Sequence, residues 1–218
     1  FKEAKYAGLY NLVISRTIFF DRLIQKSLKQ SEQFVVLGAG FDTRSYGGIC
    51  DKGVRCFELD KEQTQKLKIN FLNKANINNS NVHFVTVDFS TENWYDKLYA
   101  SGYNKKKATI FLWEGVTLYL SDKDVRNTLK EIKQNSATGS VVLADFYSNH
   151  FVNGDMLPGK KRLNVTNEAF RFGIDFENNG SKELTSLVES ENLRLGEVYY
   201  MGSRTKYGTW MSVAEILI

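Results

Sequence analysis

The sequence predicts an α/β fold: an open, doubly wound sheet that is mostly parallel, with helices on both faces and an antiparallel hairpin near the end of the chain. Segments typical of strands and of helices alternate five times before residue 147. Most of the strand segments are apolar throughout, as in a parallel sheet that helices cover on both faces. A Gly-x-Gly turn follows the first strand, and such sheets bind ligands at the carboxyl ends of their strands.

Length and charge define the class of protein. With 218 residues, the chain is long enough for one large domain with a full hydrophobic core. We expect a single domain over 1–218, with a helical segment over about 1–30 and a lid over about 147–176. The net charge of +4 is spread along the chain, and we interpret the basic runs 105–107 and 160–162 as solvated loops. No apolar run reaches the roughly 18 residues of a membrane helix, so we expect neither a nucleic acid nor a membrane as partner.

Cysteine and histidine content argues against two kinds of site. Cys50 and Cys56 lie close together, one near a loop and one in a predicted strand, which argues against a disulfide framework. A reducing, cytoplasmic location is therefore expected. His83 and His150 lie far apart, with no cysteine at ligand spacing, so no metal site is expected.

The first expected element is a helix over about Leu9–Lys29, because apolar residues recur there at near-helical spacing with polar residues between them. The apolar run Phe34–Gly38 is the first expected strand, and Val54–Glu58 is the second. A helix is expected over about Lys61–Lys74, and an Asn-rich turn separates it from the third strand at Val82–Val87.

The next elements continue the alternation. A short helix over about Trp94–Ala100 precedes the fourth strand, Ala108–Trp113. Ser121 has the character of a helix N-cap, and Asp124 stands three residues later as an imperfect capping-box partner. The helix that begins there ends shortly before the fifth strand, Ser140–Phe146.

After the fifth strand the alternation stops. The segment Tyr147–Phe176 holds the single proline of the chain, a basic cluster and several aromatic residues, and we interpret it as an insertion or lid over the cleft. A helix over about Ser181–Glu191 follows. Two strands, Arg194–Met201 and Thr209–Ile218, are joined by a turn short enough for an antiparallel hairpin.

The most informative motif is the run Val35–Arg44, which has the sequence Val-Val-Leu-Gly-Ala-Gly-Phe-Asp-Thr-Arg. Its glycines leave no side chain between the backbone and a ligand. About twenty residues later the second strand carries Glu58 and Asp60, and a carboxylate at that place accepts hydrogen bonds from both hydroxyls of a ribose. Together these features indicate an adenosine-containing cofactor.

The residues around the turn narrow the choice of cofactor. A dinucleotide-binding loop has a third glycine where this chain has Thr43, and Asp42 would repel a pyrophosphate. S-adenosylmethionine carries no phosphate, and the terminal hairpin fits its methyltransferases. Two alternatives stay open: an NAD-dependent oxidoreductase, and a non-catalytic cofactor-binding module on the same fold.

Several motifs occur in one order and together are specific. The chain closely resembles the leucine carboxyl methyltransferase-like family of S-adenosylmethionine-dependent methyltransferases, and the resemblance extends from about residue 16 to 146. It implies the Rossmann-like class I methyltransferase fold, with a seven-stranded sheet, and S-adenosylhomocysteine as the product of the cofactor. The motifs that carry it are Val36–Arg44, Phe57–Asp60, Val87–Phe89 and Glu114–Leu120, with Ser15–Thr17 and Asp21 upstream.

The resemblance implies which residues bind the methionine part of the cofactor. Arg16 resembles the arginine that binds its carboxylate, for which a guanidinium fork has the right geometry. Gly38 and Gly40 would pass beneath the methionine chain. Glu114, after the fourth strand, would bind the ammonium group, since a lone buried carboxylate is costly.

The resemblance also assigns the adenosine. Asp60 resembles the acid that binds the ribose, although Glu58, two residues earlier in the strand, faces the same side and could take the role. Asp88 resembles the acid that accepts from the exocyclic amine of adenine, and the Phe89 backbone N–H would reach a ring nitrogen. An N-cap role for Asp88 is the alternative.

The expected reaction is an in-line methyl transfer that needs no metal. A carboxylate acceptor is already ionised at neutral pH, whereas a hydroxyl usually needs a general base. The weak catalytic candidates are Tyr119, which could line the acceptor pocket, and His150, just after the fifth strand. The sequence therefore predicts an O-methyltransferase acting on a carboxylate or hydroxyl of a small molecule or a peptide C-terminus, and leaves open the acceptor, ester against ether product, and the oligomeric state.

Overall fold

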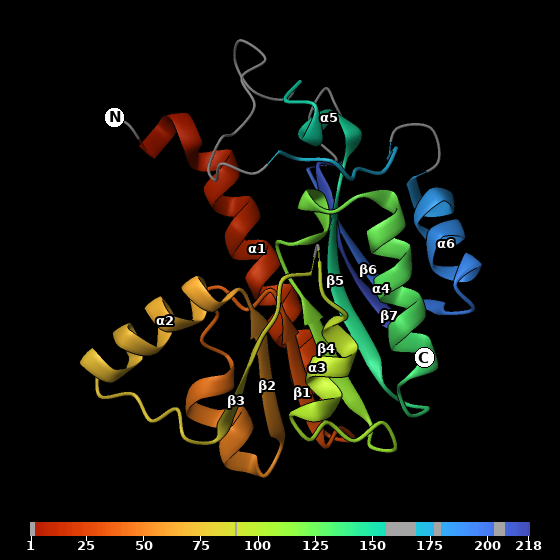
Figure 1. Ribbon diagram of the computed structural model, residues 1–218. Helices are drawn as coiled ribbons and strands as arrows, with labels where there is room; N and C mark the ends of the chain where they lie inside the picture. Colours follow the sequence, from red (N-terminus) through yellow and green to blue (C-terminus); the bar gives the residue numbers. More distant parts are fainter. Residues whose placement is uncertain (1–2, 90, 156–168, 177–179, 203–207) are drawn as a thin grey trace.

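A single twisted sheet forms the centre of the computed structural model, which describes residues 3–89, 91–155, 169–176, 180–202 and 208–218. In that part of the chain, seven strands lie in the order β3-β2-β1-β4-β5-β7-β6 (Figure 1). The first five strands are parallel, and β7 is antiparallel to both β5 and β6. This confirms the predicted fold class. The strands are β1 Gln33–Leu37, β2 Arg55–Asp60, β3 Val82–Thr86, β4 Thr109–Trp113, β5 Val141–Tyr147, β6 Arg194–Met201 and β7 Met211–Leu217.

Helices cover both faces of the sheet (Figure 1). Alternate residues of the central strands face opposite sides: Val35 packs into a cluster with α3, α4 and α6, whereas Val36 packs into a second cluster with α1. Every residue of β1, β4 and β5 is buried, which explains why these strands are apolar almost throughout. The helices are α1 Glu3–Ser27, α2 Glu62–Lys74, α3 Trp94–Ala100, α4 Asp122–Gln134, α5 Asn149–Val152 and α6 Gly180–Ser190.

The capping box predicted at the start of α4 is present. The hydroxyl of Ser121 accepts from the backbone N–H of Asp124 at 3.2 Å, and the Ser121 N–H donates to the Asp124 carboxylate at 3.4 Å. An aspartate can therefore close the box in this chain, although its side chain is one methylene shorter than the usual glutamate.

The connection between β1 and β2 departs from the usual crossover helix. A π-helical turn, η1 (Ser45–Ile49), continues into a short 3₁₀ turn, η2 (Cys50–Lys52), before β2 begins. This path places Cys50 beside Cys56 in β2, with their Cα atoms 5.9 Å apart, and the two form a disulfide. The sequence argued against a disulfide framework, and this bond contradicts that argument, because cysteine spacing says nothing about a turn that returns the chain onto its own next strand.

The segment predicted as a lid is described in part. Ser148, after β5, forms a parallel bridge with Ile174, and α5 follows directly. Residues 156–168 of the predicted lid lie outside the described residues. A search of the described helices for one long and apolar enough to cross a bilayer finds none.

Candidate functional site

The glycine turn after β1 lies where the strand order reverses, between β2 on one side and β4 on the other. Ligands bind at such switch points in open α/β sheets. Gly38 and Gly40 have φ values of +69° and +44°, which side-chain-bearing residues rarely adopt. A Cβ atom on Gly38 would also lie 2.6 Å from a methyl carbon of Val116, so the loop after β4 closes directly over this turn.

The two acids of β2 have different partners in the structure. Asp60, at the strand end, accepts from the backbone N–H of Gly40 at 2.6 Å and from that of Lys61 at 2.7 Å. Glu58 is fully buried, pairs with Lys68 at 2.6 Å and accepts from the Tyr46 hydroxyl at 3.0 Å. The Asp60 carboxylate therefore lies against the glycine turn, whereas Glu58 is engaged beneath it. This geometry favours Asp60 as the ribose ligand, and that role stays a prediction.

The centre of the site is an ion cluster at the ends of β4 and β5. Arg16, from α1, contacts Glu114 at 2.9 Å and Asp145 at 3.0 Å, and it donates to the Tyr147 hydroxyl at 2.8 Å. The fully buried Asp145 also accepts from the Gly115 backbone N–H at 2.9 and 3.0 Å and from the Tyr147 hydroxyl at 2.9 Å. Arg16 and Glu114, predicted to bind opposite ends of one amino acid, thus lie side by side.

A second arginine joins the same cluster. Arg44 donates to the other oxygen of Glu114 at 2.7 Å and to Asp21, on α1, at 2.6 Å. It also forms an ion pair with Asp42, two residues before it. The side chains of Arg44 and Glu114 are only 16% and 12% exposed, so this network is shielded from the solvent that weakens surface ion pairs.

Burial and charge oppose each other at the two acids of the cluster. Burial raises the pKa of Glu114, and the neighbouring carboxylates of Asp145 and Asp42 act in the same direction, while Arg16 and Arg44 lower it. Burial likewise raises the pKa of Asp145, against the effect of Arg16 and the Gly115 N–H. The guanidinium groups thus oppose the effect of burial on both acids and favour their ionised forms.

The residues predicted to bind adenine lie on the neighbouring strand end. Asp88 and Phe89 follow β3, and the Val87 N–H donates to the Asp60 carbonyl at 2.9 Å, which holds this loop beside the ribose candidate. The Asp88 N–H donates to the Glu92 carboxylate at 2.9 Å. Both residues are half-buried, and their binding roles stay predictions.

Tyr119, the first weak catalytic candidate, lies among aromatic rings. The Tyr119 ring is 5.4 Å from that of Phe170, which stacks on Phe151 at 6.0 Å; Phe151 in turn lies 5.1 Å from the ring of Tyr147. Tyr147 thereby connects these aromatic rings to Arg16. An acceptor with an apolar body would meet aromatic surface here.

His150, on α5, is partnered by an acid. Its Nδ1 lies 3.1 Å from an Asp155 carboxylate oxygen. It lines a cavity of about 170 Å³ at the end of β5, together with Ser148, Asn149 and Asp175 among others. The geometry gives His150 an orienting acid but does not bring it into the Arg16–Glu114 cluster.

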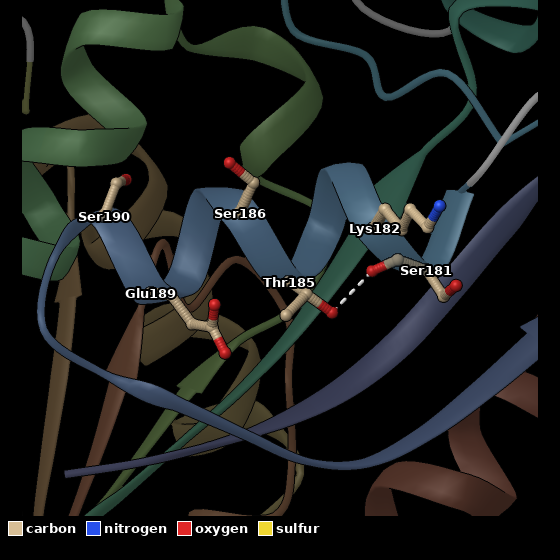
Figure 2. Close-up of a pocket in the computed structure, with 6 residues that line it drawn as sticks. All are labelled: Ser181, Lys182, Thr185, Ser186, Glu189 and Ser190. Atoms are coloured by element: carbon tan, nitrogen blue, oxygen red, sulfur yellow. Dashed lines mark hydrogen bonds between the residues drawn. The ribbon is translucent and has the colours of Figure 1, made fainter.

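Figure 2 shows a second hollow, along α6. All its lining residues belong to that one helix, and the Thr185 hydroxyl donates to the Ser181 carbonyl at 2.5 Å within it. It lies away from the glycine turn and the ion cluster (Figure 1), and we assign it no role.

Sequence reasoning missed two members of the cluster, Asp145 and Tyr147, and also the contact of Arg44 with Glu114. The signal for Asp145 was available, because an acid in the middle of the apolar run Val141–Tyr147 needs a buried partner. Nothing in the sequence indicated that this partner would come from α1, 129 residues away.

Comparison with known proteins finds one matching family and several similar sequences. The family model described as Leucine carboxyl methyltransferase matches residues 2–133. Two curated relatives, both named as candidate S-adenosyl-L-methionine-dependent methyltransferases, are YktD of Bacillus subtilis and SCO7813 of Streptomyces coelicolor. YktD is 29% identical over 61% of this chain and 44% of its own length. SCO7813 is 31% identical over 64% of this chain and 49% of its own length. The chain thus spans about half the length of these relatives.

Solved structures show the same fold at low identity. An S-adenosylmethionine-dependent methyltransferase from Clostridium acetobutylicum superposes with a TM-score of 0.64 at 12% identity, covering 100% of this chain and 99% of that one. The PH0226 protein from Pyrococcus horikoshii gives a TM-score of 0.62 at 12% identity, covering 94% and 90%. At such identities the likeness shows the fold alone.

Proposed function

Since the chain belongs to the leucine carboxyl methyltransferase family, we propose that it is an S-adenosylmethionine-dependent O-methyltransferase. The observation that carries the proposal is the contact of Arg16 with Glu114 at 2.9 Å, beside a glycine turn at the switch point of the sheet. A free amino acid group presents one carboxylate and one ammonium, and this pair presents one complementary charge to each. The names of the curated relatives support the same cofactor.

The residues present fit this cofactor. The Asp60 carboxylate would bind the ribose, and Asp88 with the Phe89 N–H would bind adenine at the next strand end. Gly38 and Gly40 would lie beneath the methionine part; a Cβ on Gly40 would meet nothing within 4 Å, so this glycine leaves open space, whereas the space beside Gly38 is closed by Val116. Arg16 and Glu114 would bind the carboxylate and the ammonium. When bound, the cofactor supplies a methyl group on a sulfonium that is already an activated leaving group.

The task of the chain is to orient and to exclude water, since the transfer itself needs no protein nucleophile. We propose that the acceptor lies on the aromatic side of the cluster, against Tyr119 and Phe170, where the rings offer an apolar surface. An acceptor carboxylate needs no base. For an acceptor hydroxyl, His150 with Asp155 is the base that the geometry supports best.

Isothermal titration with S-adenosylhomocysteine tests the cofactor. Asp60→Ala should weaken binding by about tenfold or more, because the buried ribose hydroxyls lose a charged acceptor. The double variant Glu58→Gln with Lys68→Met is the matched control: it removes the neighbouring acid of β2 without leaving its buried partner unpaired, and it should leave the affinity within about twofold. Absence of heat from the folded wild-type protein at millimolar ligand would refute the proposal, and an effect of the double variant larger than that of Asp60→Ala would reverse the ribose assignment.

A screen of acceptors with radiolabelled S-adenosylmethionine tests the reaction. We expect labelled product from a carboxylate or hydroxyl compound with an apolar body, and release of the label by mild base identifies an ester rather than an ether. Retained cofactor binding with no transfer to any acceptor would instead favour the non-catalytic binding module.

A cytoplasmic location remains a prediction, and the Cys50–Cys56 disulfide bears against it. Alkylation of the protein in fresh lysate, followed by mass measurement, distinguishes free cysteines from the disulfide. A cytoplasmic protein should take up two alkyl groups without prior reduction.

A further inference from the structure

We propose that Arg44 is a positioning residue for the cofactor: it holds one carboxylate oxygen of Glu114, so that the other oxygen can accept the ammonium group of S-adenosylmethionine. The two arginines of the cluster contact different oxygens of this acid. Arg44 donates to Oε2 at 2.7 Å, and Arg16 contacts Oε1 at 2.9 Å. The inference rests on the proposed function, because it concerns the same site.

Arg44 is fixed from several directions. Its backbone N–H donates to Asp42 Oδ1 at 2.7 Å, and its Nη1 contacts the other oxygen of that acid. Its Nε donates to Asp21 at 2.6 Å, and its guanidinium carbon lies 5.9 Å from the centre of the Phe20 ring. An arginine held by the glycine loop and by α1 keeps its place when a ligand enters, and so can hold Glu114 in one orientation.

Arg16 has a different role when the cofactor binds. Its Nη2 contacts the oxygen of Glu114 that faces it, and its Nη1 is held by Asp145 and Tyr147. A zwitterion entering between Arg16 and Glu114 replaces that one contact with two, because its carboxylate meets the guanidinium and its ammonium meets Oε1. The contact of Arg44 with Oε2 does not compete with the ligand.

Arg44 also maintains the charge of Glu114 through this exchange. Burial, Asp145 and Asp42 all raise the pKa of Glu114, and Arg16 and Arg44 lower it. Once Arg16 has turned to the ligand carboxylate, Arg44 is the remaining cation of the chain in contact with Glu114, and the ammonium needs an ionised partner.

Three ligands resolve the role of Arg44 by titration calorimetry. S-adenosylhomocysteine has both charged groups, its decarboxylated analogue keeps only the amine, and 5′-methylthioadenosine has neither. Arg44→Gln should weaken the binding of S-adenosylhomocysteine and of its decarboxylated analogue by about tenfold or more. It should change the affinity for 5′-methylthioadenosine by less than about twofold. Arg16→Gln should weaken S-adenosylhomocysteine most, since it removes the partner of the carboxylate.

Further readouts separate positioning from folding. In Arg44→Gln the affinity for S-adenosylhomocysteine should fall at a higher pH on acidification than in the wild type, because Glu114 has lost a cation that lowers its pKa. Arg44→Lys should recover part of the affinity. Arg126→Gln, which removes an exposed ion pair on α4, is the control and should match the wild type. Thermal unfolding with 5′-methylthioadenosine present confirms that each variant is folded.

The outcomes are distinct. Equal weakening of all three ligands would show a purely structural role, and unchanged affinity for S-adenosylhomocysteine would show that Arg44 is dispensable; either refutes the inference. If Arg44→Gln weakens the binding only of the ligand that carries a carboxylate, Arg44 binds that carboxylate, which also refutes the inference. If the wild type binds none of the ligands, the proposed function itself fails, whereas wild-type binding that Arg44→Gln leaves intact removes only the role of Arg44.

Discussion

Replacing Asp145 by alanine should destabilise the fold more than any exposed substitution. The carboxylate is fully buried and accepts from the Gly115 N–H, the Tyr147 hydroxyl and the Arg16 guanidinium, all at 2.9 to 3.0 Å. Alanine leaves these donors without that acceptor, and the Asp145 side chain that it replaces is fully buried. The change therefore breaks a buried ion pair and exposes unsatisfied donors at the same time.

The magnitude follows from these contacts. Removing one partner of a buried ion pair costs about 3–5 kcal/mol, and the loss of Asp145 belongs to this class. For a chain of this size, each kcal/mol lowers the melting temperature by about 2–4 °C, so the expected shift is roughly 6–20 °C. The free energy of unfolding of Asp145→Asn should lie between those of the wild type and the alanine variant. Its amide keeps one acceptor oxygen, but its NH₂ group is a donor that faces the Arg16 guanidinium.

Urea unfolding followed by circular dichroism measures this difference, with Asp122→Ala as control. Asp122 pairs with Arg126 on the exposed side of α4, and its removal should cost less than about 1 kcal/mol. A loss below about 1 kcal/mol for Asp145→Ala would show that the donors find other partners, and the reasoning from buried contacts would be wrong. S-adenosylhomocysteine affinity should also fall, since Arg16 loses one of the groups that orient it.

Three further predictions concern other parts of the fold. Burial lowers the pKa of His83 from its ordinary 6.5. A histidine whose pKa is lower in the folded state contributes stability that is present above 6.5 and is lost as the pH falls. The urea midpoint of the wild type should therefore drop between about pH 7 and pH 5, and that of His83→Gln should drop less. Lys68→Met leaves Glu58 as an unpaired buried carboxylate and should cost about 3–5 kcal/mol in urea unfolding, most of which Lys68→Met with Glu58→Gln should restore. Gly38→Ala should cost about 1–3 kcal/mol and weaken S-adenosylhomocysteine, whereas Gly40→Ala, where a Cβ would meet nothing within 4 Å, should cost only the backbone part.

The sheet was predictable because its information is local. A fully buried strand such as β1 is apolar along its whole length, and the glycine turn that ends it needs a backbone conformation that other residues avoid. The expected strand Arg194–Met201 agrees with β6 to the residue, and Trp94–Ala100 agrees with α3. These segments carry their own periodicity and end signals, so no distant residue was needed to define them.

What the sequence left open depends on distant contacts. The first helix was expected to begin at about Leu9, but α1 begins at Glu3, since helix starts without a clear cap carry little signal. The hydrogen bond of Arg44 with Glu114 joins residues 70 positions apart, and that of Arg16 with Tyr147 joins residues 131 positions apart. Spacing within a motif names the residue types at a site, but only the packing of α1 against the sheet decides which of them touch.

The balance of charge at the strand ends distinguishes the proposed cofactor from a dinucleotide. Two guanidinium groups contact four carboxylates there, and these groups belong to Arg16, Arg44, Asp21, Asp42, Glu114 and Asp145. The cluster thus carries excess negative charge within a chain whose net charge is +4. A pyrophosphate would add negative charge to it, in a shielded place where the repulsion is strong. A donor with a sulfonium and an ammonium instead brings positive charge. In the proposed reaction, methyl transfer would remove the sulfonium charge, so the same carboxylates would attract the product less than the donor and assist its release.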